Sequence, residues 1–157
     1  MVKKLFAILA CVAIGMALFV GCSNATTKPA AKGDTLAGDK LSITKLSGWE
    51  QMAVPGGFQI YKASGEILQI QVLGNNVSEA EDKAVLESLS KANNGSALEQ
   101  VDLLGLKFYK TFYTANGKEQ VFYSTVRNGE QVKLQATGQS YDSNPDIKVM
   151  VESIQLK

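Results

Sequence analysis

The hydrophobic and polar positions of residues 58–73 alternate in two short runs that are separated by Ser64 and Gly65. Alternation with a period of two places successive side chains on opposite faces of a β-strand. In the second run one face is apolar and the other polar, with Leu68, Ile70 and Val72 against Gln69 and Gln71. The pattern predicts two strands joined as a hairpin.

Residues 78–95 have the pattern of an amphipathic helix. Ser78 and Glu81 form the capping-box sequence Ser-x-x-Glu, whose side chains satisfy free backbone N–H groups at a helix start. Gly95 stands where the end of a helix favours a positive φ. An apolar stripe lies between these points, formed by Ala84, Val85, Leu89 and Ala92. We expect the central helix of the domain here.

Three further runs rich in β-branched and aromatic residues follow, at Leu106–Thr114, Glu119–Arg127 and Gln131–Thr137. They are separated by Asn116-Gly117 and Asn128-Gly129. Asn-Gly favours a tight hairpin turn, because both residues tolerate positive φ. The runs therefore predict an antiparallel meander.

The end of the chain predicts a second helix. Asn144 suits an N-cap, Pro145 suits the first helical position, and apolar residues recur at Ile147, Met150, Val151 and Ile154. In the meander, Phe108 and Phe112 point one way and Tyr109 and Tyr113 the other. A sheet with large side chains on both faces needs cover on both. We expect an α+β fold, with a central antiparallel sheet and helices packed on its faces.

The N-terminus reads as an export signal. Lys3 and Lys4 precede sixteen uncharged residues, Leu5 to Val20. A helix of that length reaches about 24 Å, short of the roughly 30 Å hydrocarbon core of a membrane.

Cys22 closes the sequence Leu18-Phe19-Val20-Gly21-Cys22, which resembles the lipobox of bacterial lipoprotein precursors. The resemblance implies cleavage before Cys22, a diacylglycerol on its thiol and a new amino terminus that can also be acylated. Phe19 departs from the pattern, because leucine is usual at that position. An ordinary secreted protein with an incidental Cys22 is the alternative.

Residues 23–40 are rich in Ser, Thr, Ala, Lys, Gly and Asp, a composition typical of a flexible linker with an r.m.s. span of about 23 Å. We therefore divide the chain into a signal peptide (1–21), a lipidated cysteine and flexible tether (22–40) and a single domain (41–157). This division predicts a protein exported and lipid-anchored to a bacterial membrane, with its domain outside the cytoplasm.

Composition excludes several chemistries. The chain has 16 basic and 15 acidic residues, so that a nucleic-acid partner is not expected. It has no histidine, which removes Ser-His-Asp and Cys-His triads and histidine zinc sites. Its two cysteines, Cys11 and Cys22, are lost with the signal and consumed by lipid, respectively, and leave no disulfide for the mature domain. Apart from the lipid on Cys22, we expect no cofactor.

Three stretches, "LSGWEQMAVPGGFQIYKA", "LGLKFYKTFYTANGKEQVFYSTVRNGEQVKLQATGQS" and "IKVMVESIQLK", resemble the PsbP-like domains. The resemblance covers most of residues 41–157 and rests on an early Trp, a long meander and a terminal helix ending in Ser-Ile. It implies a central antiparallel sheet between helices, and binding or assembly roles rather than a shared catalytic centre. Other α+β folds, such as cystatin-like ones, give the same order of elements.

Three groups of residues suggest chemistry but have simpler interpretations. Ser88 to Lys91 match the Ser-x-x-Lys of penicillin-recognising enzymes, without the other elements those enzymes need. Alternating oxygen ligands suggest a calcium loop that lacks its later Gly and Glu, at Asp142, Asn144 and Asp146. Acidic residues at a helix start are explained by the helix dipole, at Glu79, Glu81 and Asp82. We therefore expect neither a catalytic residue nor a metal site among them.

Four aromatic residues are the candidates for a ligand surface, namely Trp49, Tyr109, Tyr113 and Tyr123. Their simpler interpretation is a place in the core beneath the helices. The function expected from the sequence is a membrane-anchored, non-enzymatic binding or assembly module, with an envelope protein or a small ligand as partner. An envelope hydrolase that uses carboxylates or a Ser-Lys pair is the alternative.

Overall fold

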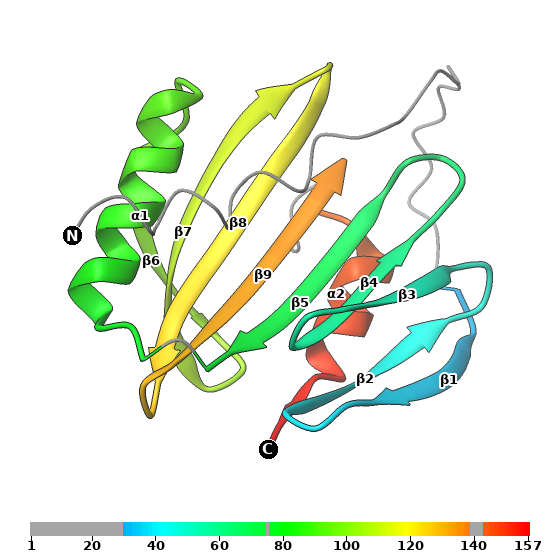
Figure 1. Ribbon diagram of the computed structural model, residues 1–157. Helices are drawn as coiled ribbons and strands as arrows, with labels where there is room; N and C mark the ends of the chain where they lie inside the picture. Colours follow the sequence, from blue (N-terminus) through cyan, green and yellow to red (C-terminus); the bar gives the residue numbers. More distant parts are fainter. Residues whose placement is uncertain (1–29, 75, 139–142) are drawn as a thin grey trace.

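The computed structural model describes residues 30–74, 76–138 and 143–157, which form two antiparallel sheets and two helices (Figure 1). The three-stranded sheet has the order β1-β2-β10, and the seven-stranded sheet has the order β3-β4-β5-β9-β8-β7-β6. The elements are β1 (Lys32–Ala37), β2 (Leu41–Leu46), β3 (Glu50–Val54), β4 (Gly57–Tyr61), β5 (Ile67–Leu73), α1 (Glu79–Ala92), β6 (Glu99–Leu103), β7 (Leu106–Ala115), β8 (Lys118–Arg127), β9 (Glu130–Gly138), α2 (Pro145–Glu152) and β10 (Gln155–Leu156).

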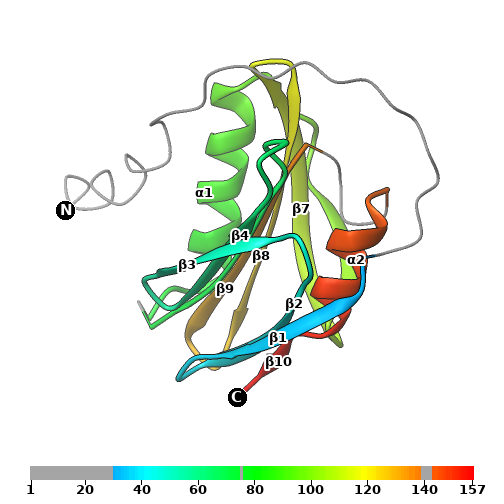
Figure 2. The same cartoon turned by 90° about the vertical axis from the view of Figure 1, so that its right-hand side faces the viewer.

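The predicted α+β architecture is confirmed. α1 covers one face of the large sheet, while α2 and the small sheet lie against the other (Figure 2). The predicted hairpin is β4–β5 and the predicted meander is β7–β8–β9. Both Asn-Gly turns have positive φ at both residues: Asn116 (52°), Gly117 (72°), Asn128 (53°) and Gly129 (76°). The local turn chemistry therefore sets the register of the meander.

α1 begins as predicted but presents a different stripe. Ser78 and Glu81 form the full capping box. The buried positions are Asp82, Leu86 and Ser90, whereas Ala84 and Ala92 are exposed. The positive φ at the helix end belongs to Asn94 (52°) rather than to Gly95. Gly95 is required for space instead, because a Cβ there would lie 2.8 Å from the Phe112 carbonyl oxygen.

The main core fills the space between the large sheet, the small sheet and α2. It contains side chains from β2, from the inner face of the large sheet and from α2, including Leu41, Ile43, Leu46, Ile60, Leu68, Leu134, Ile147 and Met150. α2 has Asn144 as its N-cap and Pro145 at its start, as predicted, but it ends at Glu152. Ile154 is buried beyond the helix, next to β10. On the face of the large sheet that lies against the main core, Phe108 is buried, whereas Phe112 is 42% exposed. The main core therefore does not extend to the far part of β7.

β1 lies inside the segment whose composition predicted a flexible tether. Residues 32–37 pair with β2, and the Ala30 N–H donates to Asp146. A strand gains its backbone hydrogen bonds whatever its side chains, and here a single apolar side chain, Leu36, is buried. The folded part of the chain therefore begins earlier than residue 41. In the part of the chain that the structure describes, neither helix is long and apolar enough to span a membrane.

Candidate functional site

A cavity of about 450 Å³ lies between α1 and the face of the large sheet that α1 covers. We call it the α1 cavity. The helix side is formed by Asp82, Val85, Leu86 and Leu89. The sheet side is formed mainly by residues of β5, β7, β8 and β9: Gln69, Gln71, Tyr113, Ala115, Gln120, Phe122, Ser124, Gln131, Lys133 and Gln135. A single helix that covers one end of a wide sheet leaves this space open beside it.

The polar floor of the α1 cavity follows from strand alternation. Positions of β5 and β9 that face the main core are apolar, so that their neighbours on the other face are free to be polar. Register places these polar residues side by side, with Gln69 opposite Gln135 and Gln71 opposite Lys133. Lys133 in turn lies opposite Ser124 on β8. Neighbouring strands thus bring amide, ammonium and hydroxyl groups to one surface.

Asp82 is the most buried charged residue of the α1 cavity, with 1% of its surface exposed. One carboxylate oxygen, Oδ1, accepts from the Ser124 hydroxyl at 2.7 Å and from the Gln131 side-chain amide. The other, Oδ2, is buried and has no hydrogen-bond partner among the described residues. A buried carboxylate oxygen without a partner is unfavourable for stability. A donor group of a ligand could offset this cost.

Lys133 is the cation of the α1 cavity. Burial lowers the pKa of Lys133 below its ordinary value, and the negative charge of Asp82 acts in the opposite direction. Within residues 30–74, 76–138 and 143–157, no carboxylate lies within ion-pair distance of its ammonium group. Asp82 and Lys133 therefore influence each other without direct contact.

The opposite wall of the α1 cavity is apolar and aromatic. The rings of Tyr113 and Phe122 stack with centroids 5.5 Å apart and planes inclined by 16°. Leu89 and Val85 of α1 line the same space. Burial raises the pKa of Tyr113, so its phenol remains a hydrogen-bond donor well above neutral pH. The α1 cavity thus combines a hydrogen-bonding floor with an apolar wall.

The four aromatic candidates do not form one surface. Tyr113 lines the α1 cavity, and Tyr109 lies near the start of α1, where its hydroxyl is 3.3 Å from Glu79. Tyr123 contributes its ring to the main core on the opposite face, although its β8 position borders the cavity. Trp49 is 1% exposed, and its indole N–H donates to Asp146 at the start of α2. The core interpretation therefore holds for Trp49 and Tyr123.

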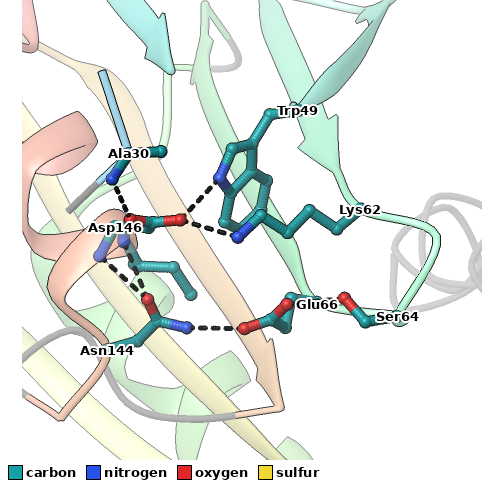
Figure 3. Close-up of polar contacts among 8 residues, drawn as sticks. Ala30, Trp49, Lys62, Ser64, Glu66, Asn144 and Asp146 are labelled. Atoms are coloured by element: carbon teal, nitrogen blue, oxygen red, sulfur yellow. Dashed lines mark hydrogen bonds and ion pairs between the residues drawn. The ribbon is translucent and has the colours of Figure 1, made fainter. Parts of the chain in front are cut away.

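Asp146 forms a second polar cluster on the other side of the sheet (Figure 3). Its carboxylate accepts from the Ala30 backbone N–H at 2.8 Å, from the Trp49 indole N–H at 3.0 Å and from the Lys62 ammonium at 2.7 Å. Burial alone would raise the pKa of Asp146, but the hydrogen bonds from Lys62, Ala30 and Trp49, with the charge of Lys62, hold it below its ordinary value. Asp146 lies at the start of α2, whereas Ala30 precedes β1, Trp49 precedes β3 and Lys62 follows β4. The cluster therefore connects three distant segments to α2.

The remaining sequence candidates are placed as follows. The side-chain oxygen of Asn144 accepts from the Asp146 and Ile147 backbone N–H groups, which is a helix cap. Asp142 and Cys22 lie outside the described residues. Across the described ranges, no three acidic or cysteine side chains are grouped to hold a metal. Ser88 is exposed and donates its hydroxyl hydrogen to the Ala84 carbonyl at 2.8 Å.

Sequence reasoning missed most of the α1 cavity. It explained Asp82 together with Glu79 and Glu81 as first-turn acids, which all three are, but it did not foresee that Asp82 is buried and bonded to Ser124 and Gln131. The missed signal was the run of polar residues on one face of strands next to an amphipathic helix, at Gln69, Gln71, Gln131, Lys133 and Gln135.

No protein-family model and no curated protein sequence matches this chain. Fifteen chains of known structure resemble it, including the following two. One is the solution structure of cyanobacterial PsbP (CyanoP) from Synechocystis sp. PCC 6803, with a TM-score of 0.52 and 11% identity over 87% of this chain and 98% of that chain. The other is a crystal structure of a protein from Bacteroides thetaiotaomicron VPI-5482, with a TM-score of 0.52 and 15% identity over 83% of this chain. That match spans about half, 49%, of the second protein. At these identities the likeness concerns the fold, and it confirms that the domain has a PsbP-like fold.

Proposed function

We propose that this chain is a membrane-anchored envelope lipoprotein whose PsbP-like domain is a non-enzymatic binding module, and that the α1 cavity is its binding site. The observation that carries this proposal is a cavity of about 450 Å³ that the side chains of the domain leave open. Its volume falls within the range of about 300–1,000 Å³ that is typical of small-molecule sites. Its mixture of an apolar wall and a few convergent polar groups is also typical of such sites.

The placement of the candidate catalytic groups favours binding over hydrolysis. Ser88 lies on the exposed side of α1, with its hydroxyl bonded to the helix backbone, and Lys91 is exposed too. Glu81 serves the capping box. The α1 cavity contains one carboxylate, Asp82, and one ammonium group, Lys133, and its other polar side chains are amides and hydroxyls. The Ser-Lys pair of the hydrolase alternative receives no support, since neither Ser88 nor Lys91 lines the α1 cavity.

The proposed anchor at Cys22 places the domain close to the membrane surface. Eight peptide units join Cys22 to Ala30, the first described residue, and can span at most about 28 Å. Because β1 belongs to the folded domain, the tether is shorter than the eighteen residues suggested by composition. The α1 cavity would therefore sample molecules in the layer next to the membrane.

Filling the α1 cavity should abolish binding. We expect Val85→Trp to weaken the binding of any cavity ligand by about tenfold or more, because the indole occupies the space between α1 and the sheet. The measurement is the ligand-induced rise in melting temperature of the mature chain, over a panel of neutral saccharides, amino acids, dipeptides and sugar acids. A ligand at a hundred times its Kd stabilises a protein by about 2.7 kcal/mol, which such a scan detects.

Ala84→Trp is the matched control, since Ala84 is the preceding residue of the same helix and faces solvent. It should bind as the unmodified chain does. Circular dichroism of both variants checks that α1 is retained. Equal ligand stabilisation of Val85→Trp and Ala84→Trp would show that binding takes place elsewhere.

A further inference from the structure

The ligand class of the α1 cavity can be read from its polar groups. Resting on the proposed function, we infer that the cavity takes a neutral, polyhydroxylated ligand, a saccharide of one or two rings, which is held between Lys133 and Asp82 and packs on the aromatic wall. Both charged residues line the cavity, and Asp82 Oδ2 is buried without a partner in the described part of the chain.

The charges of the cavity favour a neutral ligand. Asp82 and Lys133 are one anion and one cation, and the other polar side chains that line the space are amides and hydroxyls. An anionic ligand on Lys133 would be repelled by Asp82, and a cationic ligand on Asp82 would be repelled by Lys133. A hydroxyl group avoids both costs, because it accepts from an ammonium and donates to a carboxylate. Oδ2 is buried, so a ligand hydroxyl that bonds to it requires a neighbouring side chain to move.

The glutamine side chains offer donors and acceptors close together. Gln69 donates to Gln71 at 2.7 Å, and Gln71 donates to the Pro55 carbonyl at 2.9 Å. Gln120 accepts from the Thr137 hydroxyl at 2.8 Å. Among the described residues, these bonds leave the side-chain NH₂ group of Gln120 and the side-chain oxygen of Gln69 available for a ligand. Hydroxyl groups, which donate and accept at one atom, suit such a mixed surface.

The aromatic wall suits the C–H face of a sugar ring. Tyr113 and Phe122 form a stacked pair at one side of the cavity, and Leu89 extends the apolar surface. A pyranose has polar edges and an apolar face, so it can bond to the floor and pack on the wall together. The volume of about 450 Å³ has room for one or two rings.

A peptide fits this site less well. Peptides are commonly held by backbone hydrogen bonds to the edge of a sheet. The floor of the α1 cavity is built from strands β5, β9, β8 and β7, which all have a neighbour on both sides. Most of their backbone groups are used in the sheet, although β6 pairs with β7 only as far as Lys110, so side chains must supply most of the contacts with the ligand.

The test measures binding of neutral saccharides to the mature chain by isothermal titration calorimetry. The probes are glucose, galactose, N-acetylglucosamine, maltose, cellobiose and diacetylchitobiose, with glucuronic acid, alanine and dialanine for comparison. We expect at least one neutral saccharide to bind, and Lys133→Met and Asp82→Asn each to weaken that binding by about tenfold to a hundredfold. Asp82→Asn keeps an oxygen for Ser124 and Gln131 but replaces the Oδ2 acceptor by a donor. Lys107→Met and Asp102→Asn, in an exposed ion pair on β6 and β7, are the matched controls and should leave binding unchanged.

The outcomes separate this inference from the proposed function. If alanine or dialanine binds in a way that Val85→Trp prevents and no neutral saccharide does, the ligand class is wrong and the binding module stands. Tighter binding of glucuronic acid than of glucose likewise overturns the neutral ligand. If none of the probes binds at millimolar concentration, both proposals fail. Should Asp82→Asn not fold, as judged by circular dichroism, Lys133→Met decides, and unchanged binding by that variant overturns the inference.

Discussion

Replacing Asp146 by alanine is expected to lower the free energy of unfolding by about 3 kcal/mol. The variant removes the acceptor of three hydrogen bonds, from Ala30, Trp49 and Lys62. The Trp49 indole N–H suffers most, because Trp49 is 1% exposed and its N–H would be left without this partner. Lys62 is less affected, since its side chain is 29% exposed and can turn to water. Urea denaturation of the mature chain measures the change.

Two further variants show whether the effect belongs to the buried cluster. Asp146→Asn retains one acceptor oxygen and should be less destabilising than alanine. Asp102→Ala breaks the exposed ion pair with Lys107, whose partners are 75% and 66% exposed, and should change stability by less than about 1 kcal/mol. Equal losses for Asp146→Ala and Asp102→Ala would contradict the role assigned to the cluster.

The effect of Asp146 should also depend on pH. Its folded pKa is lowered, so its contribution is fully present above its unfolded pKa of about 3.9 and is lost as the pH falls through the lower folded value. The difference in stability between the unmodified chain and Asp146→Ala should therefore be constant near neutrality and shrink below about pH 4. If the difference in stability between the two chains were the same near neutrality and below about pH 4, the charge of Asp146 would not contribute to stability.

Replacing Cys22 by alanine is expected to abolish the lipidated mature form and to leave the precursor uncleaved at that site. In the proposed anchor the thiol carries the diacylglycerol, and each buried methylene contributes about 0.8 kcal/mol, so that two chains hold a protein stably. Alanine cannot form the thioether, and processing at that site should stop. The intact mass of the chain measures both effects, because the precursor keeps the mass of the signal and lacks that of the lipid.

Cys11→Ala is the control for this experiment, because Cys11 lies in the hydrophobic part of the signal and is removed with it. That variant should remain on the membrane with an unchanged mature mass. An unmodified mature N-terminus at a residue other than Cys22 in the natural chain would refute the lipoprotein assignment and leave the cavity proposals untouched.

Local signals explain which elements could be predicted. The hairpin at Ser64-Gly65 and the meander with its two Asn-Gly turns depend on neighbouring residues, as does the capping box of α1. β1 could not be predicted, because its stability comes from pairing with β2 and from the bond of Ala30 to Asp146, 116 residues away. β10 is two residues long, and its partner β2 is also distant in the sequence.

The α1 cavity illustrates a different limit. Gln71 and Lys133 are opposite each other because β5 pairs with β9, although α1 and the three strands β6, β7 and β8 separate them in the chain. Each glutamine alone reads as an ordinary exposed position of a strand. Asp82 reads as an ordinary first-turn acid, and its burial depends on Ser124 and Gln131 of two other strands. The pattern on one face was visible in the sequence, but the space above it depends on how α1 is set against the sheet.

The central claim is that ligands bind between α1 and the large sheet, and side-chain amide signals in ¹⁵N-correlated NMR spectra test it directly. On titration with a saccharide, the NH₂ signals of four of the glutamines that line the α1 cavity, Gln69, Gln71, Gln120 and Gln135, should shift together. The indole N–H of Trp49, which is bonded to Asp146 on the opposite side of the sheet, should stay in place. A shift of the Trp49 indole signal without shifts of these glutamine signals would contradict the account.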